Sequence, residues 1–287
     1  MDLRLGRSDF PAGTFAVMAI VNRTPDSFYD GGATFELNAA LDAVARAVAE
    51  GADLVDVGGV RAGMGPPVDI DEELRRVLPL VRGVRERHPD LVISVDTWRA
   101  VVARDAVDAG ADLINDTWAG ADPELVEVAA ETGAGIVCSH SGGLAPRIDP
   151  HRVRFDDVVA DVVATVTEGA ARAVEAGVRP DGILVDPTHD FGKNTRHSLE
   201  LTRRLDEVVA ISWPVLVALS RKDFVGETLD LPPGERLEGT LAATAISAWH
   251  GARVFRTHDV RATRRVLDMV ASIRGTRPPS VARRGLV

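Results

Sequence analysis

The feature that most constrains the fold is a unit that recurs along the chain: a short apolar run, a polar loop and a stretch in which apolar residues follow helical spacing. The apolar runs are too short for most helices and favour buried strands. A chain that alternates such strands with amphipathic helices is typical of an α/β protein with a parallel sheet. The runs are Phe15–Val21, Leu54–Val57, Leu91–Val95, Asp112–Ile114, Gly135–Cys138, Gly182–Val185, Val215–Leu219 and Arg253–Phe255.

Glycines support this division of the chain. Those that come shortly before predicted strands, and so indicate helix ends, are Gly51, Gly110, Gly133 and Gly251. Eight strand and helix units with no long polar linker predict one domain, a (β/α)8 TIM barrel over residues 1–274. The alternative is an open doubly wound sheet. Residues 275–287 carry no helical stripe, and we expect a mobile tail there.

Composition narrows the possible partners and location. The net charge of −10 argues against general binding to nucleic acids or to anionic membranes, because both need an excess of basic surface. Met1–Gly13 lacks an apolar signal core, and no apolar run approaches the roughly 20 residues of a membrane span. We therefore expect a cytoplasmic protein. The single cysteine, Cys138, lies in an apolar run, which favours inert packing over reactivity.

Polar side chains gather where the predicted strands end, which is where a barrel of this kind places its functional groups. Asp96, Asn115, Asp186 and Lys222 together offer donors and acceptors in several directions. Such a set suits the edge of a flat heterocycle that carries amide N–H and C=O groups. Buried charges in one mouth are costly unless they bind one another or a ligand, so a polar ligand is implied.

A second group of strand-end residues has a different chemistry. Asn22, Arg256 and His258 follow the first and last predicted strands, and together they could hold an anion such as a phosphate. Asp56 and Asp116 could instead only cap turns. A pair of carboxylates could also serve a glycosidase, but the lysine and asparagine beside them disfavour that reading. The chain has no Walker loop, no zinc spacing and no Gly-x-Gly-x-x-Gly motif after a strand.

These motifs resemble those of the dihydropteroate synthase family over nearly the whole chain. The matching blocks are Asn22-Arg-Thr-Pro-Asp-Ser-Phe28 with Asp30-Gly-Gly32, Asp56-Val-Gly-Gly59, Ser94-Val-Asp-Thr97, Gly110-Ala-Asp-Leu-Ile-Asn-Asp116, Asp186-Pro187 with Phe191-Gly-Lys193, Ser220-Arg-Lys222 and Arg256-Thr-His-Asp259. The resemblance implies a (β/α)8 barrel that forms a homodimer. It also implies an enzyme that joins p-aminobenzoate to 6-hydroxymethyl-7,8-dihydropterin diphosphate in folate synthesis.

The resemblance also implies roles for single residues. Asp96, Asn115, Asp186 and Lys222 would hold the pterin, and three of these, Lys222, Asp96 and Asp186, would be catalytic. Asn22 with a Mg²⁺ ion, Arg256 and His258 would hold the diphosphate, which leaves first and gives a cationic pterin stabilised by the carboxylates. Phe191 and Ser220 match positions near the p-aminobenzoate, and Phe28 lies in the first loop. Thr34 is expected to cap the helix that follows this loop.

The chain departs from the family pattern in the loops. After Asp56-Val-Gly-Gly59 the family usually reads Glu-Ser-Thr-Arg-Pro-Gly, whereas this chain has Val60-Arg-Ala-Gly-Met-Gly65. The usual Met-His-Met is Cys138-Ser-His140, which predicts a histidine in place of a methionine against the pterin face. The usual Gly-Ile-Gly is Thr188-His-Asp190, and Arg23 stands where an apolar residue is common. These departures resemble the divergent second copy of the family in actinobacteria and predict weak or absent synthase activity.

Three functional hypotheses remain. One is a pterin-binding homologue that catalyses little or no condensation. Another is a working dihydropteroate synthase in which Arg23 and Arg61 replace the lost loop arginine. A third is a methyltransferase that uses a folate and a corrinoid partner, which the lack of an accompanying cobalamin domain disfavours. Each predicts pterin-like or p-aminobenzoate-like ligands and no nucleic acid or membrane partner.

Overall fold

A computed structural model describes residues 1–24, 32, 34–148 and 153–285 of the chain. Eight parallel strands pair in the order β8-β7-β6-β5-β4-β3-β10-β9, and a bridge between Val185 and Val215 brings the two ends of this series together. This closure confirms the barrel and excludes the open sheet. The strands are β3 (Ala16–Asn22), β4 (Leu54–Gly58), β5 (Val92–Asp96), β6 (Leu113–Asp116), β7 (Gly135–Ser139), β8 (Ile183–Asp186), β9 (Leu216–Ala218) and β10 (Val254–Thr257).

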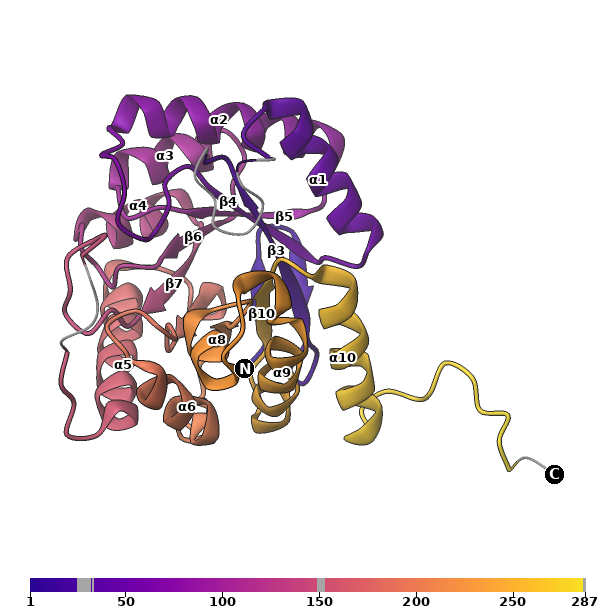
Figure 1. The fold of residues 1–287 in the computed structure, drawn as a ribbon. Helices are drawn as coiled ribbons and strands as arrows, with labels where there is room; N and C mark the ends of the chain where they lie inside the picture. The colour runs from indigo at the N-terminus through magenta and orange to yellow at the C-terminus, as the bar shows by residue number, and fades with distance from the viewer. Residues whose placement is uncertain (25–31, 33, 149–152, 286–287) are drawn as a thin grey trace.

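The helices surround the strands, as Figure 1 shows. They are α1 (Leu37–Ala49), α2 (Ile70–Arg87), α3 (Ala100–Asp108), α4 (Glu124–Thr132), α5 (Val158–Ala176), α6 (Thr195–Arg203), α7 (Leu205–Val209), α8 (Asp223–Leu229), α9 (Leu237–His250) and α10 (Val260–Ile273), with short 3-10 turns η1 (Pro180–Gly182) and η2 (Pro233–Glu235). Within the described residues, no helix combines the length and the apolar character that a membrane crossing needs.

Local sequence explains where these helices begin and end. In α1 the buried side chains Ala40, Leu41 and Val44 follow the predicted helical spacing. Its N-cap is Glu36, so the prediction that Thr34 caps this helix is wrong; the Thr34 hydroxyl instead donates to the Asn22 carbonyl at 2.6 Å. A cap position needs its side chain beside the first free backbone N–H groups, and Thr34 lies too far upstream. The predicted glycine stops all adopt positive φ: Gly51, Gly110, Gly133 and Gly251.

Two apolar layers stabilise the barrel. The larger one lies between the outer faces of the strands and the helices, and Val55, Ile93 and Ile114 belong to it. The smaller one fills the barrel interior with strand side chains that alternate with the outward ones, such as Met18, Leu54, Leu113, Val137 and Leu184. The strands are thus buried on both faces, which is why they appear in the sequence as short, nearly continuous apolar runs.

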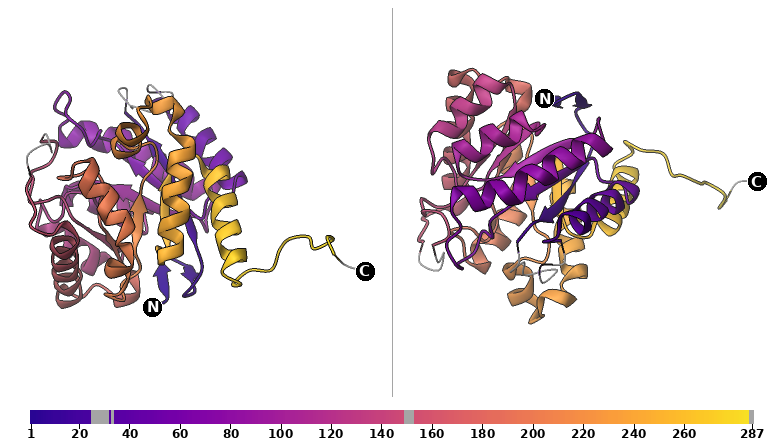
Figure 2. Two further views of the ribbon diagram at one scale, coloured as in Figure 1. Left: turned by 60° about the horizontal axis from the view of Figure 1, so that its bottom comes forward. Right: turned by 90° about the horizontal axis from the view of Figure 1, so that it is seen from above.

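An N-terminal hairpin completes the inner layer. β1 (Leu3–Leu5) and β2 (Ser8–Phe10) pair antiparallel, and Figure 2 shows them at one end of the barrel. Leu3 and Leu5 are fully buried among the interior side chains. Arg253, at the start of the last barrel repeat, fixes the hairpin by donating to the carbonyls of Met1 at 2.9 Å and Phe10 at 3.0 Å. No strand was predicted in this segment from the sequence.

The chain beyond α10 runs away from the barrel (Figure 1). Residues 275–285 contain no helix or strand and their side chains are exposed. The mobility expected of this tail stays a prediction.

Candidate functional site

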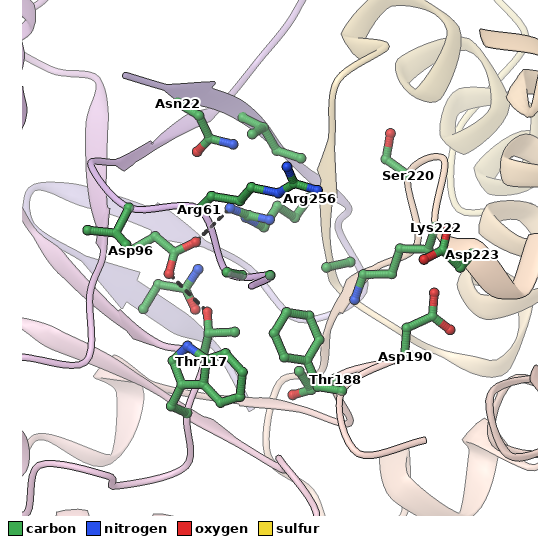
Figure 3. Close-up of a pocket in the computed structure, with 18 of the residues that line it drawn as sticks. Asn22, Arg61, Asp96, Thr117, Thr188, Asp190, Ser220, Lys222, Asp223 and Arg256 are labelled. Atoms are coloured by element: carbon green, nitrogen blue, oxygen red, sulfur yellow. Dashed lines mark hydrogen bonds and ion pairs between the residues drawn. The ribbon is translucent and has the colours of Figure 1, made fainter. Parts of the chain in front are cut away.

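A pocket of about 530 Å³ opens where the barrel strands end. Its wall includes all nine predicted ligand-binding residues: Asn22, Asp96, Asn115, Asp186, Phe191, Ser220, Lys222, Arg256 and His258. They come from six strand ends and the loops that follow, so the structure brings together residues that are far apart in sequence. Figure 3 shows Asn22, Asp96 and Arg256 on one side of the pocket and Ser220 and Lys222 on the other. The chemical roles assigned to these residues remain predictions.

On the first side, one guanidinium joins two carboxylates. Arg256 donates from Nε to Asp56 Oδ2 at 2.6 Å and from Nη2 to Asp96 Oδ2 at 2.8 Å. The buried Asp56 also accepts from the Ser94 hydroxyl at 2.6 Å and from the Asn115 amide at 3.2 Å. Asp56 is therefore the centre of a buried network and no turn cap. Arg256, which the sequence grouped with the anion-binding residues, therefore contacts Asp96, one of the residues predicted to hold the pterin.

Burial changes the pKa of one carboxyl in this cluster, that of Asp96. It raises the pKa of Asp96 to about 7; the attraction of Arg256 opposes the rise and the repulsion of Asp56 adds to it. The Thr117 hydroxyl donates at 3.0 Å to Asp96 Oδ1, the oxygen that Arg256 does not contact. Nearby Asp116 does cap a turn, because it accepts from the backbone N–H groups of Trp118 at 3.1 Å and Gly120 at 2.6 Å.

On the second side, Lys222 faces an aromatic wall. Its ammonium lies 4.8 Å from the centre of the Phe191 ring and donates to the His189 carbonyl. Phe191 in turn packs edge to face against Trp118, with ring centres 5.2 Å apart. Burial raises the pKa of Asp186, whereas the charge of Lys222 opposes this rise. The wall can therefore accept a flat ring with a polar edge directed to Asp186 and Lys222.

The ends of the neighbouring strands β9 and β10 contact each other in the pocket wall. Ser220 Oγ lies 3.0 Å from His258 Nδ1, and the His258 backbone N–H donates to the same oxygen at 3.2 Å. Arg221 and Asp259, the residues that follow, form an ion pair through two bonds of 2.9 Å. This bidentate pair locks the loops after β9 and β10 together and so fixes Ser220 and His258.

Asn22, the residue predicted to bind magnesium, offers one amide oxygen as a ligand. Asn22 lines the pocket, and its side-chain oxygen lies only 2.6 Å from where a Cβ on Gly58 would sit, which explains the glycine there. Among the described residues, no group of three His, Cys, Asp or Glu side chains is placed to hold a metal ion. Mg²⁺ bound by phosphates needs only one or two protein ligands. The donor set therefore fits Mg²⁺ only together with a diphosphate.

The loop after β4 lies over the pocket. Val60, Ala62 and Met64 line it with apolar side chains, and Arg61 adds a positive charge. Figure 3 shows the Arg61 side chain extending into the pocket. Arg147, from the loop after β7, donates to the carbonyls of Gly63 at 3.1 Å and Pro66 at 3.0 Å. We call this contact the Arg147 clasp; it ties the two loops together.

Arg23 does not enter the pocket, so the hypothesis that it replaces the lost loop arginine is wrong. Its guanidinium donates to the Phe35 carbonyl at 2.9 and 2.8 Å and to the Arg76 carbonyl at 2.8 Å. Strand alternation explains the direction: Asn22 faces the pocket, and the next side chain points to the helix layer. There it fastens the chain after β3 to α2.

The histidine predicted against the pterin face also points elsewhere. His140 is buried outside the pocket, with Nε2 2.6 Å from Asp161 of α5 and Nδ1 2.7 Å from the Lys193 ammonium. Burial lowers the pKa of His140 to about 4, so its ring is neutral near pH 7 and accepts from Lys193. Lys193 also donates to the Thr188 and Phe191 carbonyls at 3.1 and 3.0 Å. The His140–Lys193 pair thus holds the backbone of the loop after β8 on the side that faces away from the pocket.

Several lining residues were not predicted from the sequence: Thr117, Trp118, Leu144, Ile148, Thr188, Asp190 and Arg221. Thr117 and Trp118 directly follow the predicted strand-end residue Asp116, so their position alone could have indicated them. Leu144 and Ile148 come from a loop without a sequence signal. Phe28 and Asp30, which belong to the first matching block, lie outside the described residues.

Comparisons with known proteins agree with this geometry. The model of the family "Pterin binding enzyme" matches residues 18–258. The chain is 63% identical to "Inactive dihydropteroate synthase 2" of Mycobacterium leprae over 94% of both chains. It is 40% identical to the dihydropteroate synthase of Escherichia coli, over 88% of this chain and 90% of that protein.

Solved structures show the same fold. The Yersinia pestis dihydropteroate synthase in complex with a sulfonamide drug superposes with a TM-score of 0.91 at 36% identity, over 96% of this chain and all of that one. The Xanthomonas albilineans dihydropteroate synthase with 4-aminobenzoic acid gives a TM-score of 0.83 at 38% identity, over 91% and 93% of the two chains. The extent of these matches, together with the nine residues gathered in one pocket, shows that the chain belongs to the pterin binding enzyme family and is a dihydropteroate synthase homologue.

Proposed function

We propose that the chain binds a pterin in the barrel mouth and condenses it with p-aminobenzoate weakly or not at all. The observation that carries this proposal is a contrast between two parts of the pocket. Asp96, Asn115, Asp186 and Lys222 line it together, whereas the loop that covers it presents Val60, Ala62 and Met64. The recognition groups are thus retained, and most polar groups of the covering loop are absent.

The retained groups suit a pterin edge. Asp186 and Asp96 supply carboxylate acceptors, and Lys222 and Asn115 supply donors around the same space. The Trp118 and Phe191 rings add an apolar wall for the flat ring system. The similarity to the inactive Mycobacterium leprae protein supports the second half of the proposal, loss of turnover.

The altered loop explains why turnover would fall. Removing one preorganised donor from developing charge typically costs about 100- to 1,000-fold in rate. The family loop offers a glutamate, hydroxyls and an arginine, whereas here Arg61 is the charged side chain that the loop brings to the pocket. Arg23 is held at the Phe35 and Arg76 carbonyls, so of the two arginines in the hypothesis Arg61 is the one placed to replace the missing arginine.

For the diphosphate we propose Asn22, Arg256 and His258, with Mg²⁺ carried as a diphosphate complex. Arg256 already contacts Asp56 and Asp96, so a diphosphate would share it with two carboxylates. Such competition weakens the hold on an anion, because the same charge is offset twice. When bound, Mg²⁺ would neutralise the leaving diphosphate, and Asn22 would orient it through one amide oxygen.

Two measurements test the proposal. Calorimetry with 6-hydroxymethylpterin should show binding, and the same titration of an Asp96→Ala variant should show none. A steady-state assay with both substrates and Mg²⁺ should give turnover at least about 1,000-fold below an active family member. Ordinary turnover would instead establish the alternative, a working synthase rebuilt around Arg61. Absence of pterin binding to the wild type would refute the proposal.

We also propose a homodimer formed through α9 and α10. These two helices pack against each other, and both expose large apolar side chains: Ile246, Trp249, Met269 and Ile273. Large apolar side chains exposed on neighbouring helices are typical of interaction sites when they form one patch, which is what we propose here. The partner that we propose is a second copy of the chain, which would cover the face with the same face.

The dimer gives a simple prediction. A Trp249→Glu substitution places a charge at a residue that is 57% exposed, so the fold should tolerate it. Light scattering after size exclusion should show a dimer for the wild type and a monomer for the variant. Glu238→Gln, on the same helix but outside the four apolar residues, is the control and should remain dimeric. A wild-type monomer would contradict the proposal.

A further inference from the structure

The loop after β8 has gained two side chains where the family usually has glycine. Thr188 and Asp190 have φ values of 52° and 69°, in the left-handed region that favours glycine. Both line the pocket. Aspartate tolerates this region better than most residues, whereas the β-branched Thr188 adopts it at a cost.

The two added side chains differ in how they are used. The Thr188 hydroxyl donates to the Asp186 carbonyl at 2.9 Å and accepts from the His140 backbone N–H at 3.2 Å. Both bonds are within the protein, so this hydroxyl serves the structure of the loops. The Asp190 carboxylate accepts from the Ser198 hydroxyl at 3.0 Å and from the Phe224 N–H at 3.2 Å. Both of these donors are neutral. Asp190 is thus fixed in place by α6 and α8; burial raises the pKa of its carboxyl, and the attraction of Lys222 and these two hydrogen bonds oppose the rise.

Several charged side chains surround Asp190 at this end of the pocket. Figure 3 shows Asp190, Asp223 and Lys222 on the same side. Asp223 is offset by Arg236 at 2.8 Å, and Arg221 by Asp259. The Lys222 ammonium bonds to the His189 carbonyl and lies over Phe191, facing both Asp186 and Asp190. The buried Lys193 also attracts these two carboxylates, but its ammonium bonds to His140 and to the backbone carbonyls behind the loop.

We propose that Asp190 makes the Phe191 end of the pocket select aromatic amines with a neutral or cationic para substituent over p-aminobenzoate. Asp190 directly precedes Phe191 and bonds to the first turn of the helix that follows Ser220, so a benzoate between Phe191 and Ser220 would meet a fixed like charge. Repulsion between two like charges at an effective dielectric constant near 20, partly offset by Lys222, weakens binding on the order of tenfold to a hundredfold. The inference rests on the proposed pterin site and assigns its second ligand.

The test compares two probes of nearly equal shape, p-aminobenzamide and p-aminobenzoate. Both are titrated into the full chain saturated with 6-hydroxymethylpterin, which has no leaving group and so cannot condense. We expect the wild type to bind the amide at least about tenfold more tightly near neutral pH. Asp190→Asn, which preserves shape and both contacts, should bring this ratio close to one.

Two further variants make the result specific. Asp223→Asn removes a carboxylate from the same side that is already paired, and it should leave the ratio unchanged. Asp190→Gly restores the residue usual in the family and should act like Asp190→Asn, which guards against a folding defect in either variant. Because the ratio compares two ligands on one protein, a purely structural role of Asp190 would not change it.

Four outcomes would overturn the inference: equal or tighter binding of the benzoate by the wild type, an unchanged ratio in both Asp190 variants, an equal change in Asp223→Asn, or no binding of either probe to any form. Binding of the pterin alone is measured in the same series. Pterin binding without selectivity overturns this inference only, whereas loss of pterin binding by the wild type overturns the proposed function as well.

Discussion

Asp96 and Asp56 share one buried guanidinium, that of Arg256. A single positive charge cannot offset both carboxylates fully, and burial disfavours the charged form of Asp96. The result is a pKa of about 7 for Asp96 against an ordinary value of 3.8. Since the folded protein holds this proton more tightly than the unfolded chain, the contribution of Asp96 to stability falls as pH rises from about 4 to about 7.

The same shift predicts pH-dependent ligand binding. A pterin N–H group needs an ionised acceptor, so affinity for 6-hydroxymethylpterin should rise with pH through the Asp96 pKa of about 7 to a plateau, and one pH unit below that pKa it should be about tenfold weaker than at the plateau. Calorimetry across this range measures it. Asp96→Asn cannot ionise and should bind weakly with little pH dependence from this position. A flat wild-type profile would show that Asp96 does not titrate or does not face the ligand.

The polar residues of the pocket could be predicted from sequence because a barrel places strand ends together. Their partners could not. Arg256 contacts Asp56 and Asp96, which are 200 and 160 positions away, and no local pattern encodes such pairs. The prediction that the His140 side chain points into the pocket was wrong for another reason. Strand alternation places His140 on the same side as Cys138, toward α5, and the prediction did not count this period of two.

At the scale of elements, the loops over the pocket depend on few contacts. The Arg147 clasp joins the loop after β4 to the loop after β7 through two backbone carbonyls. Arg147 itself has a φ of 65°, which a residue other than glycine adopts at a cost. The contacts of its guanidinium offset this cost, so the clasp holds the covering loop in place.

Removing the clasp should loosen the loop without unfolding the barrel. We expect Arg147→Ala to speed hydrogen exchange of the amides from Gly63 to Val68 by about tenfold, because losing hydrogen bonds of about 1 to 1.5 kcal/mol favours local opening. Mass spectrometry of peptic fragments measures this. Arg147→Lys retains the charge but loses the planar fork and should be intermediate. Exchange in α5 should not change, and equal acceleration there would mean general destabilisation.

Sequence periodicity predicted the barrel strands and most helices because each buries a continuous stripe or run. It could not predict β1 and β2, since strands of three residues are too short to show a period. The α1 cap was also placed wrongly, because Thr34 has the chemistry of a cap but bonds to the Asn22 carbonyl. Element ends are decided by such tertiary contacts, which the sequence does not display.

For the molecule as a whole, the N-terminal hairpin closes one end of the barrel interior. Leu5 is fully buried there, and a Leu5→Ala substitution should lower the free energy of unfolding by about 2 to 5 kcal/mol. Urea titration followed by circular dichroism measures the loss. Leu199→Ala, on an exposed part of α6, is the matched control and should change stability by no more than about 0.5 kcal/mol. Equal stabilities of the two variants would show that the hairpin contributes little.

The ion pairs of Arg256 have a consequence for how the chain is made. They join β10, near the end of the chain, to β4 and β5, synthesised 200 and 160 residues earlier. During synthesis, Asp56 and Asp96 therefore lack their counterion, Arg256, until β10 has emerged from the ribosome. Closing such long loops is slow and entropically unfavourable until the last strand docks. A nascent or truncated chain that ends before β10 lacks Arg256 and His258 of the pocket, so ligand affinity in a translation reaction would report when β10 has been synthesised.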